Sequence, residues 1–139
     1  MKLKVSYSIP EKVDYFNLFE STGWNKEYRL SPGLLFETIN NSWFFVCVYN
    51  DEKLIGFGRV ISDGILHALI VDLIVAPEFQ KCGIGKLLLK ELVAKCKSAG
   101  IADIQLFCAK GKEKFYLKQG FKPRSPDSPG MEFVGFNSI

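Results

Sequence analysis

The architecture of this chain follows from the segment Val71-Asp-Leu-Ile-Val-Ala-Pro-Glu-Phe-Gln-Lys-Cys-Gly-Ile-Gly-Lys-Leu-Leu-Leu89. The segment begins as an almost continuous apolar run, passes through a polar turn with two glycines, and ends as an amphipathic pattern. The first N–H groups of a helix have no intrahelical acceptor, and the helix dipole favours negative charge at that end. The segment therefore predicts a buried strand, a turn, and a helix whose N-terminus can hold phosphate.

Two common phosphate-binding turns do not fit this segment. A Walker loop needs a glycine five residues before its Gly-Lys pair and a Ser or Thr directly after the pair. In this chain Gln80 stands five residues before Gly85-Lys86, and Leu87 follows the pair. A dinucleotide-binding fingerprint needs a third small residue after Gly83-Ile84-Gly85, where this chain has Leu88. Both interpretations are therefore rejected.

A third pattern does fit. Gln80-Lys-Cys-Gly-Ile-Gly85 matches Gln/Arg-x-x-Gly-x-Gly/Ala, and here the chain resembles the GNAT N-acetyltransferase superfamily. Asp72-Leu-Ile-Val-Ala-Pro77 and Phe115-Tyr-Leu-Lys-Gln-Gly-Phe121 are similar to family segments in the expected order and separation. The resemblance implies an α/β domain of the α+β type with about four helices. Its mixed, mostly antiparallel sheet would have six to seven strands and be splayed at the central strand.

Length and composition predict one domain over residues 1–139, and the resemblance implies that it is an N-acetyltransferase domain. The chain is 47% hydrophobic and 24% charged, as in soluble globular proteins. It has no long apolar segment and no secretory signal pattern, which predicts a cytoplasmic protein without membrane contact. A net charge of +3 suits an anionic cofactor and argues against a nucleic-acid binder.

The cysteines and the single histidine predict no metal site. The four cysteines are scattered without Cys-x-x-Cys spacing, and their thiols are expected to stay reduced. Cys47, Cys96 and Cys108 have apolar neighbours, so we expect them in the core.

The rest of the chain supplies the elements around the segment. The patterns predict strands near residues 5–9, 43–49, 54–61, 65–75, 101–108 and 131–136, and helices near 10–22, 32–39, 84–99 and 112–119. Asp63-Gly64 predicts a tight hairpin and hence an antiparallel meander. A long helix separates the strands near 65–75 and 101–108, so this pair should be parallel.

The resemblance implies that acetyl-CoA is the co-substrate and that backbone N–H groups of the turn bind its pyrophosphate. The implied cofactor-binding residues are Ile74, Val75, Gln80, Lys81, Cys82, Gly83, Ile84, Gly85 and Lys86. Among them, Ile74 and Val75 would use their backbones to hold the pantetheine arm and polarise the thioester carbonyl. Many family members have glycine directly after the Gln, where this chain has Lys81, and a basic residue at the place of Cys82.

Tyr116 is the candidate acid. An amine that attacks a thioester expels a thiolate, and a phenol can protonate that thiolate. In many members of the resembled family a tyrosine at this position has this role. The alternative for Tyr116 is simple packing, as we expect for Phe115. The family often has Asn at the position of Ala109, so one common contact is missing.

Asp72 is the one acid in an otherwise apolar strand. A buried carboxylate costs several kcal/mol unless it faces a site, a partner or water. Asp72 is therefore either a base for the amine or a structural carboxylate paired with Arg59. Glu37 and an ordered water chain are other candidate bases, whereas His67 is expected at the surface or rim. Cys82 could carry the acetyl group covalently, but direct transfer in a ternary complex is preferred.

These features predict an acetyl-CoA-dependent N-acetyltransferase that acts on a primary amine of a small molecule or a protein. In the family the region of Gly23–Arg29 meets the acceptor, so Trp24, Tyr28 and Glu37 are candidate acceptor-binding residues. Analogy also suggests a homodimer with Met131–Phe136 as a contact. The alternatives are a non-catalytic acyl-CoA sensor or docking module, and an acetyltransferase toxin acting on charged tRNA, which the modest charge disfavours.

Overall fold

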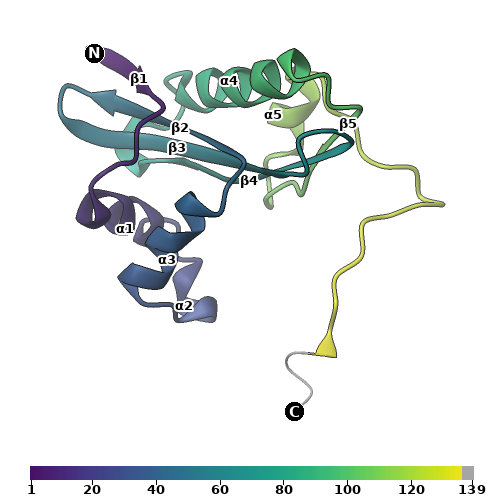
Figure 1. The fold of residues 1–139 in the computed structure, drawn as a ribbon, viewed down its shortest axis with the longest axis horizontal. Helices are drawn as coiled ribbons and strands as arrows, with labels where there is room; N and C mark the ends of the chain where they lie inside the picture. The colour runs from purple at the N-terminus through teal and green to yellow at the C-terminus, as the bar shows by residue number, and fades with distance from the viewer. Residues whose placement is uncertain (136–139) are drawn as a thin grey trace. The chain divides into compact units, whose positions relative to one another are not determined.

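The computed structural model describes residues 1–135, which form two compact parts, residues 1–106 and residues 107–135. The first part is a five-stranded sheet with α4 on one face and α1 and α3 on the other (Figure 1). The elements are β1 (Leu3–Ser6), α1 (Lys12–Glu20), α2 (Asn25–Tyr28), α3 (Pro32–Asn40), β2 (Phe44–Asn50), β3 (Lys53–Ser62), β4 (His67–Val75), the 3-10 helix η1 (Pro77–Phe79), α4 (Ile84–Ser98), β5 (Asp103–Leu106) and α5 (Glu113–Lys118). None of the helices in residues 1–135 is both long enough and apolar enough to span a bilayer.

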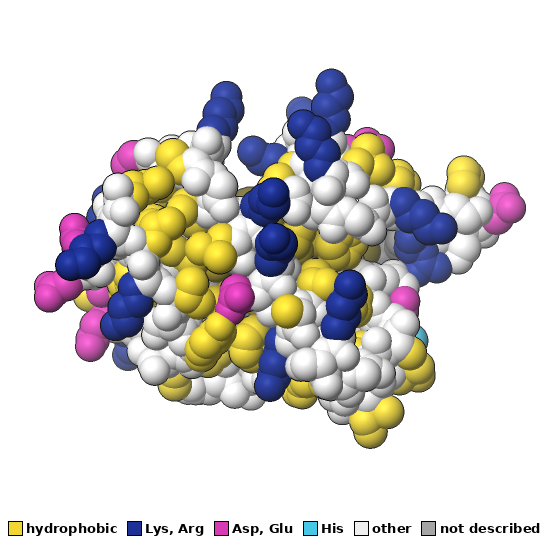
Figure 2. All heavy atoms as spheres, turned by 90° about the horizontal axis from the view of Figure 1, so that it is seen from above, with side chains coloured by type: hydrophobic (Ala, Val, Ile, Leu, Met, Phe, Trp, Pro, Cys, Tyr) yellow, Lys and Arg dark blue, Asp and Glu magenta, His cyan; other side chains and the backbone are white. Residues whose placement is uncertain are grey.

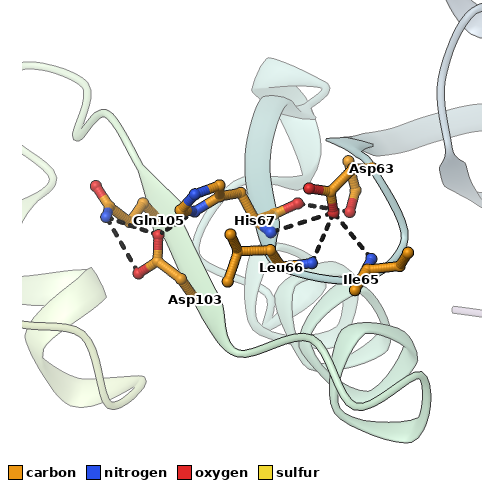
Figure 3. A network of polar contacts seen from close by, with 7 residues as sticks. Asp63, Ile65, Leu66, His67, Asp103 and Gln105 are labelled. Atoms are coloured by element: carbon orange, nitrogen blue, oxygen red, sulfur yellow. Dashed lines mark hydrogen bonds and ion pairs between the residues drawn. The ribbon is translucent and has the colours of Figure 1, made fainter.

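The sheet has the order β1-β2-β3-β4-β5, and its strand directions are those predicted. β1 to β4 pair antiparallel, and β5 pairs parallel with β4 because α4 carries the chain back across the sheet. The connection between β3 and β4 is longer than the tight Asp63-Gly64 turn that the sequence predicted. Asp63 Oδ1 accepts hydrogen bonds from the N–H groups of Ile65, Leu66 and His67 at 2.8, 2.7 and 3.2 Å (Figure 3). These bonds stabilise a four-residue connection and lower the pKa of Asp63.

The predicted number of strands was wrong for the described residues. The sheet has five strands rather than six to seven, and residues 131–135 of the predicted last strand are not in a strand. Residue 136 of that strand lies outside the described residues. A β-rich run becomes a strand only where a partner edge pairs with it, and composition does not reveal whether such an edge exists.

The helices also differ from the prediction, because there are five α-helices in residues 1–135 rather than about four. The additional one is α2, a single turn that is too short to show helical periodicity. The start of α3 is as predicted, with Pro32 at the first helical position and Ser31 Oγ accepting the Leu34 N–H at 3.2 Å. Of the three cysteines expected in the core, Cys47 and Cys96 are buried but Cys108 is exposed.

Two glycines on β3 determine how closely α4 approaches the sheet. A Cβ at Gly58 would lie 2.8 Å from Leu92 Cδ1, and one at Gly56 would lie 3.0 Å from both Ile84 Cγ2 and Leu88 Cδ1. These three α4 side chains are almost fully buried. Close packing on β3 therefore fixes the N-terminus of α4 beside the end of β4.

The opposite face of the sheet contains a buried tyrosine. Tyr15 on α1 is 0% exposed, and its ring packs edge-on against Phe57 with centroids 4.9 Å apart. Burial raises the pKa of Tyr15 to about 12, although the nearby Thr38 side chain acts in the opposite direction.

Tyr15→Phe should therefore reduce the alkaline sensitivity of the fold. In the unfolded chain Tyr15 ionises near pH 10.0, but in the folded chain it ionises only near pH 12. Its contribution to stability is present below pH 10 and is lost between those values, with a loss of about 3 kcal/mol in unfolding free energy. Urea unfolding at neutral and alkaline pH should show similar stability near neutrality and a smaller alkaline decline in Tyr15→Phe. An equally steep decline in both proteins would contradict this prediction.

Candidate functional site

The site begins on β4, which continues beyond its parallel partner. β4 pairs with β5 only from His67 to Ile70, and β5 ends at Leu106 opposite Ile70. On its other side β4 pairs with β3 as far as Val75. In residues 1–135 the second half of β4 thus has a strand partner on one side only. The resemblance implied such a splay, and an open strand edge offers N–H and C=O groups to a ligand.

A β-bulge lies within this half of β4. Arg59 pairs with Val71 and Phe57 pairs with Ile74, so two steps along β3 are matched by three steps along β4. Asp72 is in the bulge with a φ of 53°, in the left-handed region that non-glycine residues rarely adopt. The bulge changes the direction of β4 immediately before Ile74 and Val75.

The turn after β4 exposes the N-terminus of α4. Lys81 has a φ of 62° and Gly83 a φ of 84°, and Gln80 Nε2 donates to the Val75 carbonyl at 3.2 Å. The first intrahelical bond runs from the Leu87 N–H to the Gly83 carbonyl at 3.1 Å. The first three residues of α4, Ile84, Gly85 and Lys86, therefore have no intrahelical acceptor for their N–H groups. This geometry suits a phosphate group.

The charges on α4 favour the same kind of ligand. α4 carries four lysines, namely Lys86, Lys90, Lys95 and Lys97, and one acid, Glu91. Glu91 accepts a hydrogen bond from the Tyr7 hydroxyl. Figure 2 looks onto the α4 side and shows basic side chains standing out from this face. The face is therefore electropositive.

Asp72 has the partner that the structural interpretation predicted. Arg59 Nε lies 2.8 Å from Asp72 Oδ2, and the two side chains are only 13% and 22% exposed. Arg59 Nη1 also lies 3.4 Å from Ser42 Oγ and 3.5 Å from the Thr38 carbonyl oxygen. Of the two interpretations left open for Asp72, this geometry favours a paired structural carboxylate.

Tyr116 belongs to residues 107–135, which are described by themselves. It lies on α5, and its ring packs against Phe115 and Phe121 with centroids 5.0 and 6.1 Å apart. Burial, and then the proximity of Cys108, raises the pKa of Tyr116 above its ordinary value of 10.0. The phenol therefore stays protonated at neutral pH, as a proton donor requires.

The three candidate acceptor-binding residues lie on or beside α2 and α3. Trp24 is 36% exposed and packs edge-on against Phe19 with centroids 5.9 Å apart. Tyr28 is 62% exposed at the end of α2, and Glu37 is exposed on α3. Their exposure leaves them available to a ligand.

His67 is at the surface, as the sequence predicted. It is the first residue of β4, whereas the glycine turn follows the other end of that strand. Its Nδ1 lies 3.0 Å from Asp103 Oδ2, and Asp103 also accepts from Gln105 Nε2 (Figure 3).

Sequence reasoning missed two features of this site. The Gln80 side chain bonds the turn to β4, and the buried Tyr15 packs on Phe57, which pairs with Ile74. The first was signalled only by the Gln of the loop pattern. The second had no signal, because a tyrosine in an amphipathic helix reads as an ordinary core residue.

Comparison with known proteins adds a family to this geometry. A family model described as an acetyltransferase (GNAT) domain matches residues 40–123. The uncharacterized N-acetyltransferase ycf52 of Pyropia yezoensis is 38% identical over 108 residues, covering 75% of this chain and 60% of that protein. This chain thus spans about three fifths of the length of that curated relative.

Two solved structures have a similar fold. A probable acetyltransferase of meticillin-resistant Staphylococcus aureus superposes with a TM-score of 0.81 at 31% identity, covering 94% of this chain and 98% of that one. The PaiA N-acetyltransferase of Thermoplasma acidophilum, solved in complex with coenzyme A, superposes with a TM-score of 0.72 at 25% identity. It covers 89% of this chain and 92% of its own.

Proposed function

This chain belongs to the GNAT acetyltransferase family, and on that premise we propose that it transfers the acetyl group of acetyl-CoA to a primary amine. The observation that carries the proposal is that the half-paired end of β4 leads into the N-terminus of α4. A strand edge and a helix N-terminus in series suit a ligand with an amide-containing arm and a pyrophosphate.

In this proposal the cofactor binds through backbone groups. The N–H groups from Gly83 to Lys86 hold the pyrophosphate, and the exposed side chains of Lys81 and Lys86 add positive charge. The open edge of β4 at Val75 pairs with the pantetheine arm, whereas the backbone groups of Ile74, which was also expected to hold the arm, face Phe57 on β3. Gln80 keeps the turn against β4 through its bond to the Val75 carbonyl. Cys82 contributes its backbone and remains a thiol, because the turn meets the pyrophosphate rather than the thioester.

The transfer is a direct attack in a ternary complex. The amine nitrogen forms a bond to the thioester carbonyl carbon, and N–H groups of β4 stabilise the negative charge on the carbonyl oxygen. The C–S bond then breaks, and Tyr116 protonates the leaving thiolate. Water takes the proton from the amine, because the Asp72 carboxylate is already engaged by Arg59.

The acceptor approaches from the side of α2 and α3. Trp24 and Tyr28 offer exposed aromatic surface, and Glu37 offers a carboxylate for an ammonium group. The acceptor is thus an amine with an apolar or aromatic body, on a small molecule or a protein. A homodimer and a cytoplasmic location stay predictions.

A calorimetric titration with acetyl-CoA tests the cofactor, with NADH as the control ligand. Saturable binding of acetyl-CoA alone is expected, followed by release of free CoA thiol when an amine is added. Binding without thiol release across a broad set of amines would instead favour the acyl-CoA sensor. Binding of NADH, or of neither ligand, would contradict the proposal.

A further inference from the structure

Asp72 has a strained backbone conformation, and the role assigned to it below rests on the proposed function. A left-handed conformation is unfavourable for a non-glycine residue by about 1–2 kcal/mol and persists only where the surroundings enforce it. Asp72 adopts it inside a strand, at the bulge that precedes Ile74 and Val75. Some interaction must therefore hold Asp72 in this conformation.

The ion pair with Arg59 can hold it. Arg59 is on the adjacent strand, directly opposite Val71, so a contact of its guanidinium with Asp72 ties the bulge to β3. Arg59 is in turn oriented by Ser42 and by the Thr38 carbonyl. Below the bulge the register places Phe57 opposite Ile74, and Tyr15 packs on Phe57. The residues that contact the bulge or flank it are thus mostly buried.

We propose that the Arg59–Asp72 ion pair is a positioning device that maintains the β4 bulge and so directs the N–H group of Val75 toward the thioester. The pair acts through the backbone and does not exchange a proton with the acceptor. What the reaction requires at position 72 is a left-handed conformation, and aspartate meets this requirement with the help of Arg59.

A base and a positioning residue respond differently to substitution. Glycine adopts positive φ without strain, and asparagine tolerates it while keeping a hydrogen-bond acceptor for Arg59. Neither side chain can act as a base. Valine is β-branched and strongly disfavours positive φ. Asp72→Gly, Asp72→Asn and Asp72→Val therefore separate the two roles.

The test measures acetyl-CoA affinity by calorimetry, the pH profile of kcat, and Tm for each variant. Asp72→Gly and Asp72→Asn should keep the affinity within about threefold and preserve the shape of the pH profile. Asp72→Val should weaken acetyl-CoA binding about tenfold, as expected when the bulge is disfavoured. The matched control is Asp51→Val, since Asp51 has the same φ of 53° but lies in the β2–β3 turn. It should lower Tm without weakening acetyl-CoA binding.

Arg59→Met provides a second test. It leaves the Asp72 carboxylate without its partner, so both Tm and acetyl-CoA affinity should fall. Adding Asp72→Gly in the same chain should restore the affinity, because the glycine needs no ion pair to hold the bulge. If Arg59 only stabilised the fold, Tm would fall while the affinity stayed unchanged.

Three results would overturn the inference. A loss of kcat of more than about 100-fold in both Asp72→Gly and Asp72→Asn, with acetyl-CoA affinity intact, would identify Asp72 as the base. Unchanged acetyl-CoA affinity in Asp72→Val would show that the site does not depend on the bulge. A failure of the unchanged protein to bind acetyl-CoA would overturn the proposed function and the inference together, whereas the first two results overturn the inference alone.

Discussion

Replacing Gly83 with alanine should weaken acetyl-CoA binding about 100-fold, the free energy of two charge-assisted hydrogen bonds at about 1.5 kcal/mol each. Gly83 is the N-cap of α4 and has a φ of 84°. A Cβ there would meet no atom within 4 Å, so the cost is conformational rather than steric. The turn can relieve that strain only by turning its N–H groups away from the phosphate position.

The opposite end of the same helix supplies a matched control. Gly100 follows α4, has a φ of 74°, and would also have an unobstructed Cβ. Gly100→Ala and Gly83→Ala should each lower the unfolding free energy by about 1 kcal/mol. Only Gly83→Ala should weaken acetyl-CoA binding in a calorimetric titration. Equal acetyl-CoA affinity in the two variants would show that the N-terminus of α4 is not part of the binding site.

The order and direction of β4, α4 and β5 could be predicted from the sequence because each depends on a local pattern. The apolar run predicted the strand, the two glycines predicted the turn, and the 3.6-residue period predicted the helix. A helix of that length between two strands of one sheet then requires a parallel pair. Local chemistry and global topology agree in this segment, so a short stretch was informative about the whole fold.

Other features depend on contacts that the sequence does not display. α2 has one turn and no period, and residues 131–135 have β-rich composition without a strand ladder. The bulge is a difference of one residue between the registers of β3 and β4. Register depends on the pairing of both strands, so the two alternatives for Asp72 could not be separated before the contact with Arg59 was known.

The turn shows the same limit at Lys81. The resemblance indicated that glycine is common at this place, and the structure supplies a physical reason, because Lys81 has a φ of 62°. A lysine there accepts backbone strain and places a cation beside the α4 N-terminus. Its conformation could not be predicted from one sequence, since left-handed residues other than glycine have only a weak local signature.

Replacing Tyr116 with phenylalanine should lower kcat about 100-fold or more, which is the usual contribution of a positioned general acid. The substitution removes only the hydroxyl, so the ring can keep its contacts with Phe115 and Phe121. Acetyl-CoA affinity should therefore stay close to that of the unchanged protein. Release of CoA thiol measures kcat, and calorimetry measures the affinity.

The pH dependence of kcat distinguishes this acid role from packing. Tyr116 donates only while it is protonated, and its pKa is raised by burial, so its protonated form persists above pH 10.0. In the unchanged protein the midpoint of the loss of kcat due to this group should lie above that pH, and Tyr116→Phe should lack this alkaline limb. Tyr7→Phe is the control, because Tyr7 is exposed and bonds to Glu91. If Tyr116→Phe and Tyr7→Phe lost the same small fraction of kcat, protonation of the leaving thiolate would not depend on the Tyr116 hydroxyl. Tyr116 would then be a packing residue.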